Sequence, residues 1–113
     1  MDESDQHALT QMLRYSESAI RLLGARDDVS VAADERTFFA VSYAVQTIGE
    51  VANRVSAEAP DGLCGIPWRN IVGMRHHLVH GYEDVRPDIL VKTVREDLPP
   101  LATELRRALE EDA

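Results

Sequence analysis

Apolar residues recur at steps of three and four along most of this chain, which is the spacing of one helix face. Glycines and prolines divide this pattern into four segments, and no alternating run of β-branched residues predicts a sheet. In the first segment, Ser4 or Asp5 is the expected N-cap and Gly24 is a natural stop. The chain is therefore predicted to be all-α.

The second segment, from about Asp34 to Ser56, has the clearest helical pattern, with Asp34 as its expected N-cap. A third helix should begin at Pro67, because the first turn of a helix tolerates a missing N–H donor, and should end around residues 79 to 82. Gly73 costs this helix about 1 kcal/mol of propensity relative to alanine, so we interpret it as a site of close helix packing. The inner face of the second segment is expected to comprise Ala40, Tyr43, Ala44, Ile48, Val51, Ala52 and Val55.

The last segment begins near Pro87 and is either kinked or split in two, because Pro99 and Pro100 interrupt its hydrogen bonding. Short connections between helices favour an up-and-down antiparallel bundle of four to five helices. With 113 residues and 44% apolar content, residues 1–113 are expected to form one domain. A homodimer that hides an apolar helix face is also expected, since so small a domain leaves much surface exposed.

The net formal charge of −8 argues against a protein that coats nucleic acid nonspecifically, because such binding is driven by basic surface. Residues 63–82 are a local exception, with a formal charge of +2 and three histidines, which leaves −10 for the rest of the chain. A polyanion is therefore expected to approach the protein at this segment.

Cys64 is the single cysteine, so an intramolecular disulfide and a cysteine-based zinc site within one chain are excluded. The N-terminus lacks the positive cluster and apolar core of a signal peptide, and no stretch approaches the roughly 18 to 20 apolar residues of a membrane span. We therefore expect a cytoplasmic protein without a membrane partner.

Three histidines fall within five positions, at His76, His77 and His80, directly after Arg75. His76 and His80 are four residues apart and share a helix face, which is the spacing of helical zinc pairs. The glutamate of the His-Glu-x-x-His pattern is missing, and no cysteine or acid supplies an obvious third ligand. A metal site is therefore the weaker hypothesis, and we predict no metal and no cofactor.

A second hypothesis pairs Arg75 with His80 for cleavage of a phosphodiester without metal. A histidine titrates near neutrality, so it can accept a proton from a ribose 2′-hydroxyl or donate one to the departing 5′-oxygen. The planar arginine fork can hold phosphate oxygens as charge builds on them. RNA supplies the nucleophile in this scheme, so the protein needs no serine or cysteine.

The two side chains would stand about 140° apart on an unbroken helix, so they converge poorly within one subunit. Either the helix ends before His80, as Gly81 permits, or the same segment of a second subunit completes the site across a two-fold axis. The structural alternative is that Arg75 pairs with a nearby acid such as Glu50, while the imidazoles interact with the dipole of the helix C-terminus.

A wider pattern surrounds the Arg75 segment. It consists of Ile48-Gly49-Glu50-Val51-Ala52, Ile66-Pro67-Trp68, Gly73-Met74-Arg75, His80-Gly81-Tyr82 and Asp97-Leu98-Pro99-Pro100-Leu101. Together these strings resemble the HepT family of HEPN-domain toxins over nearly the whole chain. Arg-x4-His alone is a weak signal, but Arg-x4-His-x-Tyr behind Ile-Pro-Trp and downstream of Ile-Gly-Glu is specific.

The resemblance implies a HEPN-like helical bundle that forms a homodimer, in which the Arg-x4-His motifs of two subunits line an RNA-cleaving cleft. Arg75 and His80 are then the catalytic pair of a metal-independent endoribonuclease toxin in a toxin–antitoxin system. His76 stands where the family carries a polar residue, often asparagine, and either assists catalysis or orients the arginine. Glu50 could also orient the arginine or contribute to the cleft.

The resemblance further implies that Tyr82 is modified by a cognate minimal nucleotidyltransferase antitoxin, which transfers AMP from ATP to the tyrosine hydroxyl and silences the toxin. Each adenylyl group would add negative charge and bulk two residues from His80, which opposes binding of an RNA phosphate. The alternative for Tyr82 is a tyrosine that packs at a helix end. The alternative for the whole chain is a noncatalytic helical module that binds a nucleotidyltransferase or a nucleotide.

Overall fold

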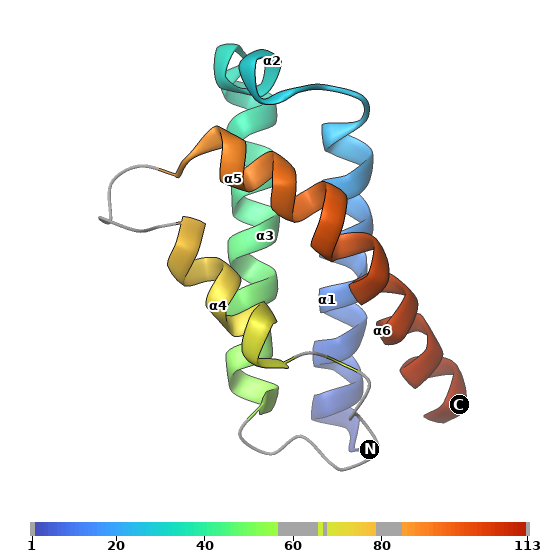
Figure 1. The fold of residues 1–113 in the computed structure, drawn as a ribbon. Helices are drawn as coiled ribbons and strands as arrows, with labels where there is room; N and C mark the ends of the chain where they lie inside the picture. Colours follow the sequence, from blue (N-terminus) through green and yellow to red (C-terminus); the bar gives the residue numbers. More distant parts are fainter. Residues whose placement is uncertain (1, 57–65, 67, 79–84, 113) are drawn as a thin grey trace.

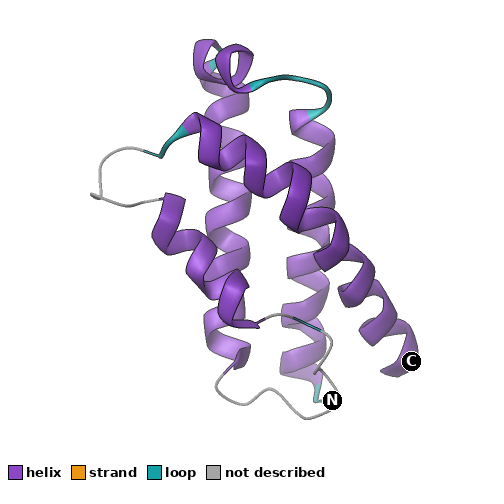
Figure 2. Cartoon of the chain, in the orientation of Figure 1, coloured by secondary structure: helices purple, strands orange, loops and turns teal. Residues whose placement is uncertain are grey.

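The computed structural model describes residues 2–56, 66, 68–78 and 85–112, and all regular structure within these ranges is helical (Figure 1, Figure 2). The elements in chain order are α1 (Glu3–Leu23), α2 (Asp28–Ala33), α3 (Glu35–Ser56), α4 (Trp68–Leu78), α5 (Pro87–Lys92), the π-helical segment η2 (Thr93–Asp97) and α6 (Leu98–Asp112). The all-α prediction is confirmed. The described helices agree with the expected bundle of four to five helices. The continuous path from α5 through η2 to α6 counts as one helix, and the short α2 is an addition to the four long ones.

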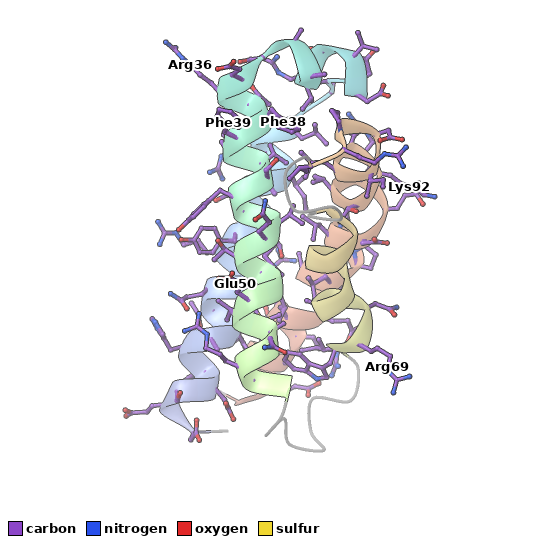
Figure 3. All side chains as sticks on the ribbon, turned by 90° about the vertical axis from the view of Figure 1, so that its left-hand side faces the viewer. Arg36, Phe38, Phe39, Glu50, Arg69 and Lys92 are labelled. Carbon is purple, nitrogen blue, oxygen red and sulfur yellow. The ribbon has the colours of Figure 1, made fainter. Side chains whose placement is uncertain are left out.

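The helices lie in two layers that pack face to face. Antiparallel α1 and α3 form one layer, and α4 together with the path from α5 to α6 forms the other (Figure 1). Figure 3, turned by 90°, shows the two layers from the side. The core between them is apolar, and its largest fully buried side chains include Leu9, Met12, Leu23, Ile48, Leu90, Leu98 and Leu105.

Local hydrogen bonds set the two ends of α1. The side chain of Asp2 accepts a hydrogen bond from the backbone N–H of Asp5 at 2.7 Å, which makes Asp2 the N-cap. The expectation of Ser4 or Asp5 at this position was wrong, because Asp2 already satisfies a donor of the first turn. Gly24 ends the helix as predicted, and its φ of +57° is a conformation that favours glycine.

Asp34 caps α3, as predicted. Its carboxylate accepts hydrogen bonds from the backbone N–H of Arg36 at 3.2 Å and of Thr37 at 3.4 Å, and from the Thr37 hydroxyl at 2.8 Å. Arg26 pairs with the same carboxylate at 3.1 Å. The hydroxyl bond from Thr37 is the largest of the causes that lower the pKa of Asp34. The preceding helix α2 was not predicted, because six residues are too few to show a helical period.

The third predicted helix corresponds to α4. Its predicted start at Pro67 and its predicted end at residues 79 to 82 lie outside the described residues. The first described turn opens at Trp68, whose backbone N–H donates to the Ile66 carbonyl at 2.8 Å. The interpretation of Gly73 as a close contact is wrong for the described residues, none of which has a heavy atom within 4 Å of the place a Cβ would take.

The two prolines of the last segment do not split it into separate helices. The π-helical turn Thr93–Asp97 joins α5 to α6 directly ahead of Pro99 and Pro100, and the N–H of Leu98 donates to the Thr93 carbonyl. A proline ring clashes with the carbonyl four residues back in an α-helix, and a wider turn relieves that clash. Residues 87–112 therefore form one continuous helical path and not two separate helices.

Candidate functional site

The last turn of α4 carries the backbone of Arg75 and His76. This helix runs antiparallel to α3 and ends on the side of the molecule where α5 begins (Figure 1). The side chains of residues 75–78 lie outside the described part of the structure, and so do the whole of His80 and Tyr82. The meeting of Arg75 with His80 thus stays a prediction, as does the role of Tyr82.

Glu50 lies on the outward side of α3 and is exposed (Figure 3). It stands two turns before the end of α3, in the layer against which α4 packs. Its proposed action on Arg75 stays a prediction, since that arginine side chain is not among those described.

Among the described side chains, no group of three or more His, Cys, Asp and Glu residues is placed to hold a metal ion. The side chains of His76 and His80, the zinc pair considered above, are not among those described. None of the described helices combines the length and the apolar character that crossing a membrane requires.

A cavity of about 630 Å³ opens between α4 and the η2–α6 path. Gly73 lines it, which explains why a Cβ at this position would meet open space. Glu96 and Asp97 of η2 stand on one side of the cavity, and Arg69 of α4 stands on the other.

Two large rings are exposed on consecutive turns of α3. Phe39 is 61% exposed and Tyr43 is 63% exposed, so the expectation of Tyr43 on the inner face was wrong. The Tyr43 ring packs edge-on against Tyr15 of α1 with 6.0 Å between centroids, and the Arg14 guanidinium lies 5.8 Å from the Tyr15 ring. Neighbouring Ala44 is buried, as expected. Tyr43 and Ala44 are adjacent apolar residues, so the helical spacing alone did not show which of them faces the core.

Three exposed cations are Arg36 at the start of α3, Arg69 on α4 and Lys92 on α5 (Figure 3). Within the described ranges none of the three forms an ion pair, whereas the exposed arginines of α6 are paired with glutamates. Of the three, Arg69 lies within residues 63–82, the segment whose formal charge is +2.

These features define the class of the protein as an all-α, HEPN-like helical bundle with an Arg-x4-His-x-Tyr sequence that starts in the last turn of α4. The model of the family described as "Ribonuclease HepT-like" matches residues 12–108. The chain therefore belongs to the HepT-like family.

Curated relatives match a part of the chain. It is 40% identical over 68 residues to a probable ribonuclease HepT of Thermococcus cleftensis, across 60% of this chain and 62% of the relative. It is 31% identical over 67 residues to a putative RNase of Methanocaldococcus jannaschii, across 59% of this chain and 62% of that relative. The matched part thus spans about three-fifths of the length of these relatives. No solved structure matches the chain.

Proposed function

We propose that the chain is an endoribonuclease toxin that cleaves RNA without a metal ion through Arg75 and His80. The observation that carries this proposal is the family match over residues 12–108, which includes the entire segment from Arg75 to Tyr82. The names of both relatives refer to ribonucleases. The positive charge of residues 63–82 within an acidic chain supports binding of a polyanion at the same segment.

In the proposed reaction the 2′-hydroxyl of the RNA attacks the adjacent phosphorus, and the bond to the 5′-oxygen of the next nucleotide breaks. His80 accepts the hydroxyl proton or donates a proton to the departing 5′-oxygen. Arg75 holds the phosphate oxygens while negative charge accumulates on them. The RNA itself supplies the nucleophile, so a guanidinium and an imidazole suffice.

Two copies of the chain are proposed to complete the site. Arg75 and His80 are separated by about 500° of helical rotation if α4 continues, which leaves them about 140° apart within one copy. A two-fold axis would bring the arginine of one copy to the histidine of the other. His76, next to the arginine, and Glu50 on α3 are proposed as supporting residues that orient it.

Tyr82 is proposed as the site where a cognate nucleotidyltransferase antitoxin adds AMP and silences the enzyme. The added phosphodiester is negatively charged and lies two residues from His80, so it opposes entry of an RNA phosphate. This part rests on the family resemblance of the His80-Gly81-Tyr82 string. Intact mass before and after incubation with ATP and a cognate nucleotidyltransferase tests it, with Tyr82→Phe as the control that should take no AMP.

The nuclease proposal is tested by incubating the purified protein with RNA in excess EDTA. Arg75→Ala and His80→Ala should each lower the rate of cleavage by about 10²- to 10⁴-fold, the usual loss for one acid–base or charge-stabilising group. His7→Ala on α1 and Arg107→Ala on α6 are matched controls on exposed positions and should cleave at the wild-type rate. Equal rates of cleavage in all four variants would rule out Arg75 and His80 as the catalytic pair.

The noncatalytic alternative is a helical module that binds a nucleotidyltransferase or a nucleotide, and the net charge of −8 favours it over RNA binding. It replaces the nuclease proposal if the wild-type protein leaves RNA intact under every condition while it forms a stoichiometric complex with that nucleotidyltransferase.

A further inference from the structure

The cavity between α4 and the η2–α6 path has the size and the lining of a small-molecule site. Its volume of about 630 Å³ lies within the range of about 300 to 1,000 Å³ that is usual for ligand pockets. Apolar side chains line it from both sides, with Ile71 and Met74 on α4, Ile89 on α5 and Leu101 on α6. An apolar ligand body can therefore be buried here.

A buried hydroxyl group lines the same cavity. Thr93 is 7% exposed and is one of the lining residues. Helical serines and threonines often donate to the carbonyl four residues back, as Ser16 and Thr103 do at 2.8 and 3.2 Å. The Thr93 hydroxyl forms no hydrogen bond with any described residue. A buried hydroxyl without a partner is unfavourable, so a ligand that supplies the partner gains affinity from it.

Two carboxylates without ion pairs stand beside that hydroxyl. Glu96 and Asp97 line the cavity from the π turn that begins at Thr93, and neither forms an ion pair within the described ranges. Glu104 lines the cavity as well, but Arg107 already pairs with it at 2.7 Å. The negative charge that a ligand would meet is therefore that of Glu96 and Asp97.

The cations near the π turn do not neutralise these two carboxylates. Arg95 donates to the backbone carbonyls of Gly24 and Arg26 at the end of α1. Arg69 lines the opposite side of the cavity from the first turn of α4, and Figure 3 shows its side chain extending away from the bundle. Two carboxylates against one exposed guanidinium favour a cation in the cavity and disfavour a phosphate.

We propose that this cavity binds a small amphipathic cation, namely a primary amine attached to an apolar body. An ammonium group has three N–H donors, which suffice for the Thr93 hydroxyl and for one oxygen each of Glu96 and Asp97. All three acceptors belong to the single turn Thr93–Asp97, and π turns inserted between α-helices are frequent at functional sites. The apolar body lies against Met74 and Leu101.

The proposed ligand is a free molecule and not a side chain of a partner protein. A pocket of this size takes up most of the surface of a drug-sized ligand, whereas one lysine or arginine side chain would fill only part of it. The site also goes beyond the proposed nuclease. Neither Arg75 nor His80 contributes to the argument, and the two carboxylates repel RNA rather than bind it.

Titration of the ¹⁵N-labelled full chain with 4-phenylbutylamine, followed by amide chemical shifts, tests the proposal. The alcohol 4-phenylbutan-1-ol and the acid 4-phenylbutyrate present the same apolar body with a neutral and an anionic head. The amine should bind with a Kd of about 0.1 to 1 mM, which is ordinary for a ligand of this size. It should bind about threefold or more tighter than the alcohol and about tenfold or more tighter than the acid. The shifted amides should be those of residues 69–74 and 89–104.

Three variants locate the apolar and the polar contacts. Gly73→Leu fills the cavity, since a Cβ at this position meets no described heavy atom within 4 Å, and should weaken amine binding by about tenfold or more. The double variant Glu96→Gln, Asp97→Asn should bind the amine and the alcohol with affinities within about twofold of each other. Thr93→Val keeps the shape of the side chain and should weaken amine binding by about two- to fivefold, while the urea midpoint stays the same or rises. Glu110→Gln, an exposed acid on α6 outside the cavity, is the charge control and should bind like the wild type.

Four results would overturn the proposal. These are no shifted amide at 5 mM amine, an alcohol that binds as tightly as the amine, a Gly73→Leu variant with wild-type circular dichroism and unchanged affinity, and a basic peptide such as acetyl-Leu-Lys-Leu-amide that binds more tightly than the amine. The last result would assign the cavity to a partner protein. The RNA-cleavage assay is a separate measurement, so loss of the nuclease proposal leaves amine binding to be decided by the titration alone.

Discussion

Replacement of Gly73 by alanine should stabilise the protein. Glycine in a helix interior is less favourable than alanine by about 0.8 to 1 kcal/mol, because it loses more backbone entropy on folding. A Cβ built at position 73 meets no heavy atom of the described residues within 4 Å, so steric strain does not offset this gain. The new methyl group lies against the cavity between α4 and the η2–α6 path, where it has room.

The expected gain is about 1 kcal/mol in the free energy of unfolding. For a domain of this size that corresponds to a rise of about 3 to 6 °C in the melting temperature. With a urea dependence of about 1 to 3 kcal/mol per molar, the unfolding midpoint should move up by roughly 0.3 to 1 M. Circular dichroism at 222 nm in thermal and urea titrations measures both quantities.

Gly24→Ala is the matched control with the opposite expected sign. Gly24 has a φ of +57°, and an added Cβ there would lie 3.8 Å from the Arg21 carbonyl, which is an ordinary contact. The cost comes from the backbone conformation, which side chains other than glycine rarely adopt, and amounts to about 1 to 3 kcal/mol. If Gly73→Ala destabilised the protein as Gly24→Ala is expected to, the reasoning from open space would be refuted and the interpretation of Gly73 as a close packing contact would stand.

Three further predictions concern stability. Leu105→Ala should cost about 2 to 5 kcal/mol in urea unfolding, because the leucine is fully buried and the cavity left behind does not close; a loss under 1 kcal/mol would contradict the core assignment. Arg95→Ala should cost about 1 kcal/mol, because its guanidinium donates to the Gly24 and Arg26 carbonyls and ties η2 to the end of α1; Arg69→Ala, without such bonds in the described part, is the control. Asp34→Ala should lower the urea midpoint at pH 7 and have a smaller effect near pH 3. The lowered pKa of Asp34 means that its contribution is present above the ordinary value of 3.8 and is lost as the pH falls through the folded-state pKa, so an effect that grows on acidification would contradict this assignment.

Much of the fold was predictable from the sequence because its signals are local. Helix α3 follows from its apolar period and from Asp34, whose side chain bonds donors only two and three residues away. Gly24 was predictable as a stop for the same reason. The six-residue helix α2 was not, since so short a segment shows no period, and Asp2 was missed because several acidic and hydroxyl residues near the N-terminus are all suitable caps.

The candidate site was likewise predictable only in part. The Arg75 segment stands out in the sequence because charge, histidines and the resemblance coincide within a few residues. The cavity beside Gly73 could not be predicted, since its walls come from α4 and from the η2–α6 path some twenty residues further along the chain. The exposed ring of Tyr43 was also missed, because its contact with Tyr15 of α1 joins residues far apart in the sequence.

By itself, the sequence determined the helical class, several helix ends and the segment in which the chemistry is expected, because hydrogen bonds and apolar period act between residues at most four positions apart. Only the tertiary structure decided that the last helix runs on through a π turn ahead of Pro99, that Gly73 borders a cavity and that Tyr43 faces outward. The cavity beside Gly73 and the outward place of Tyr43 depend on how helices from distant parts of the chain pack, which no local pattern records; the π turn lies beside the two prolines, but their presence alone left a kink and a split helix equally open.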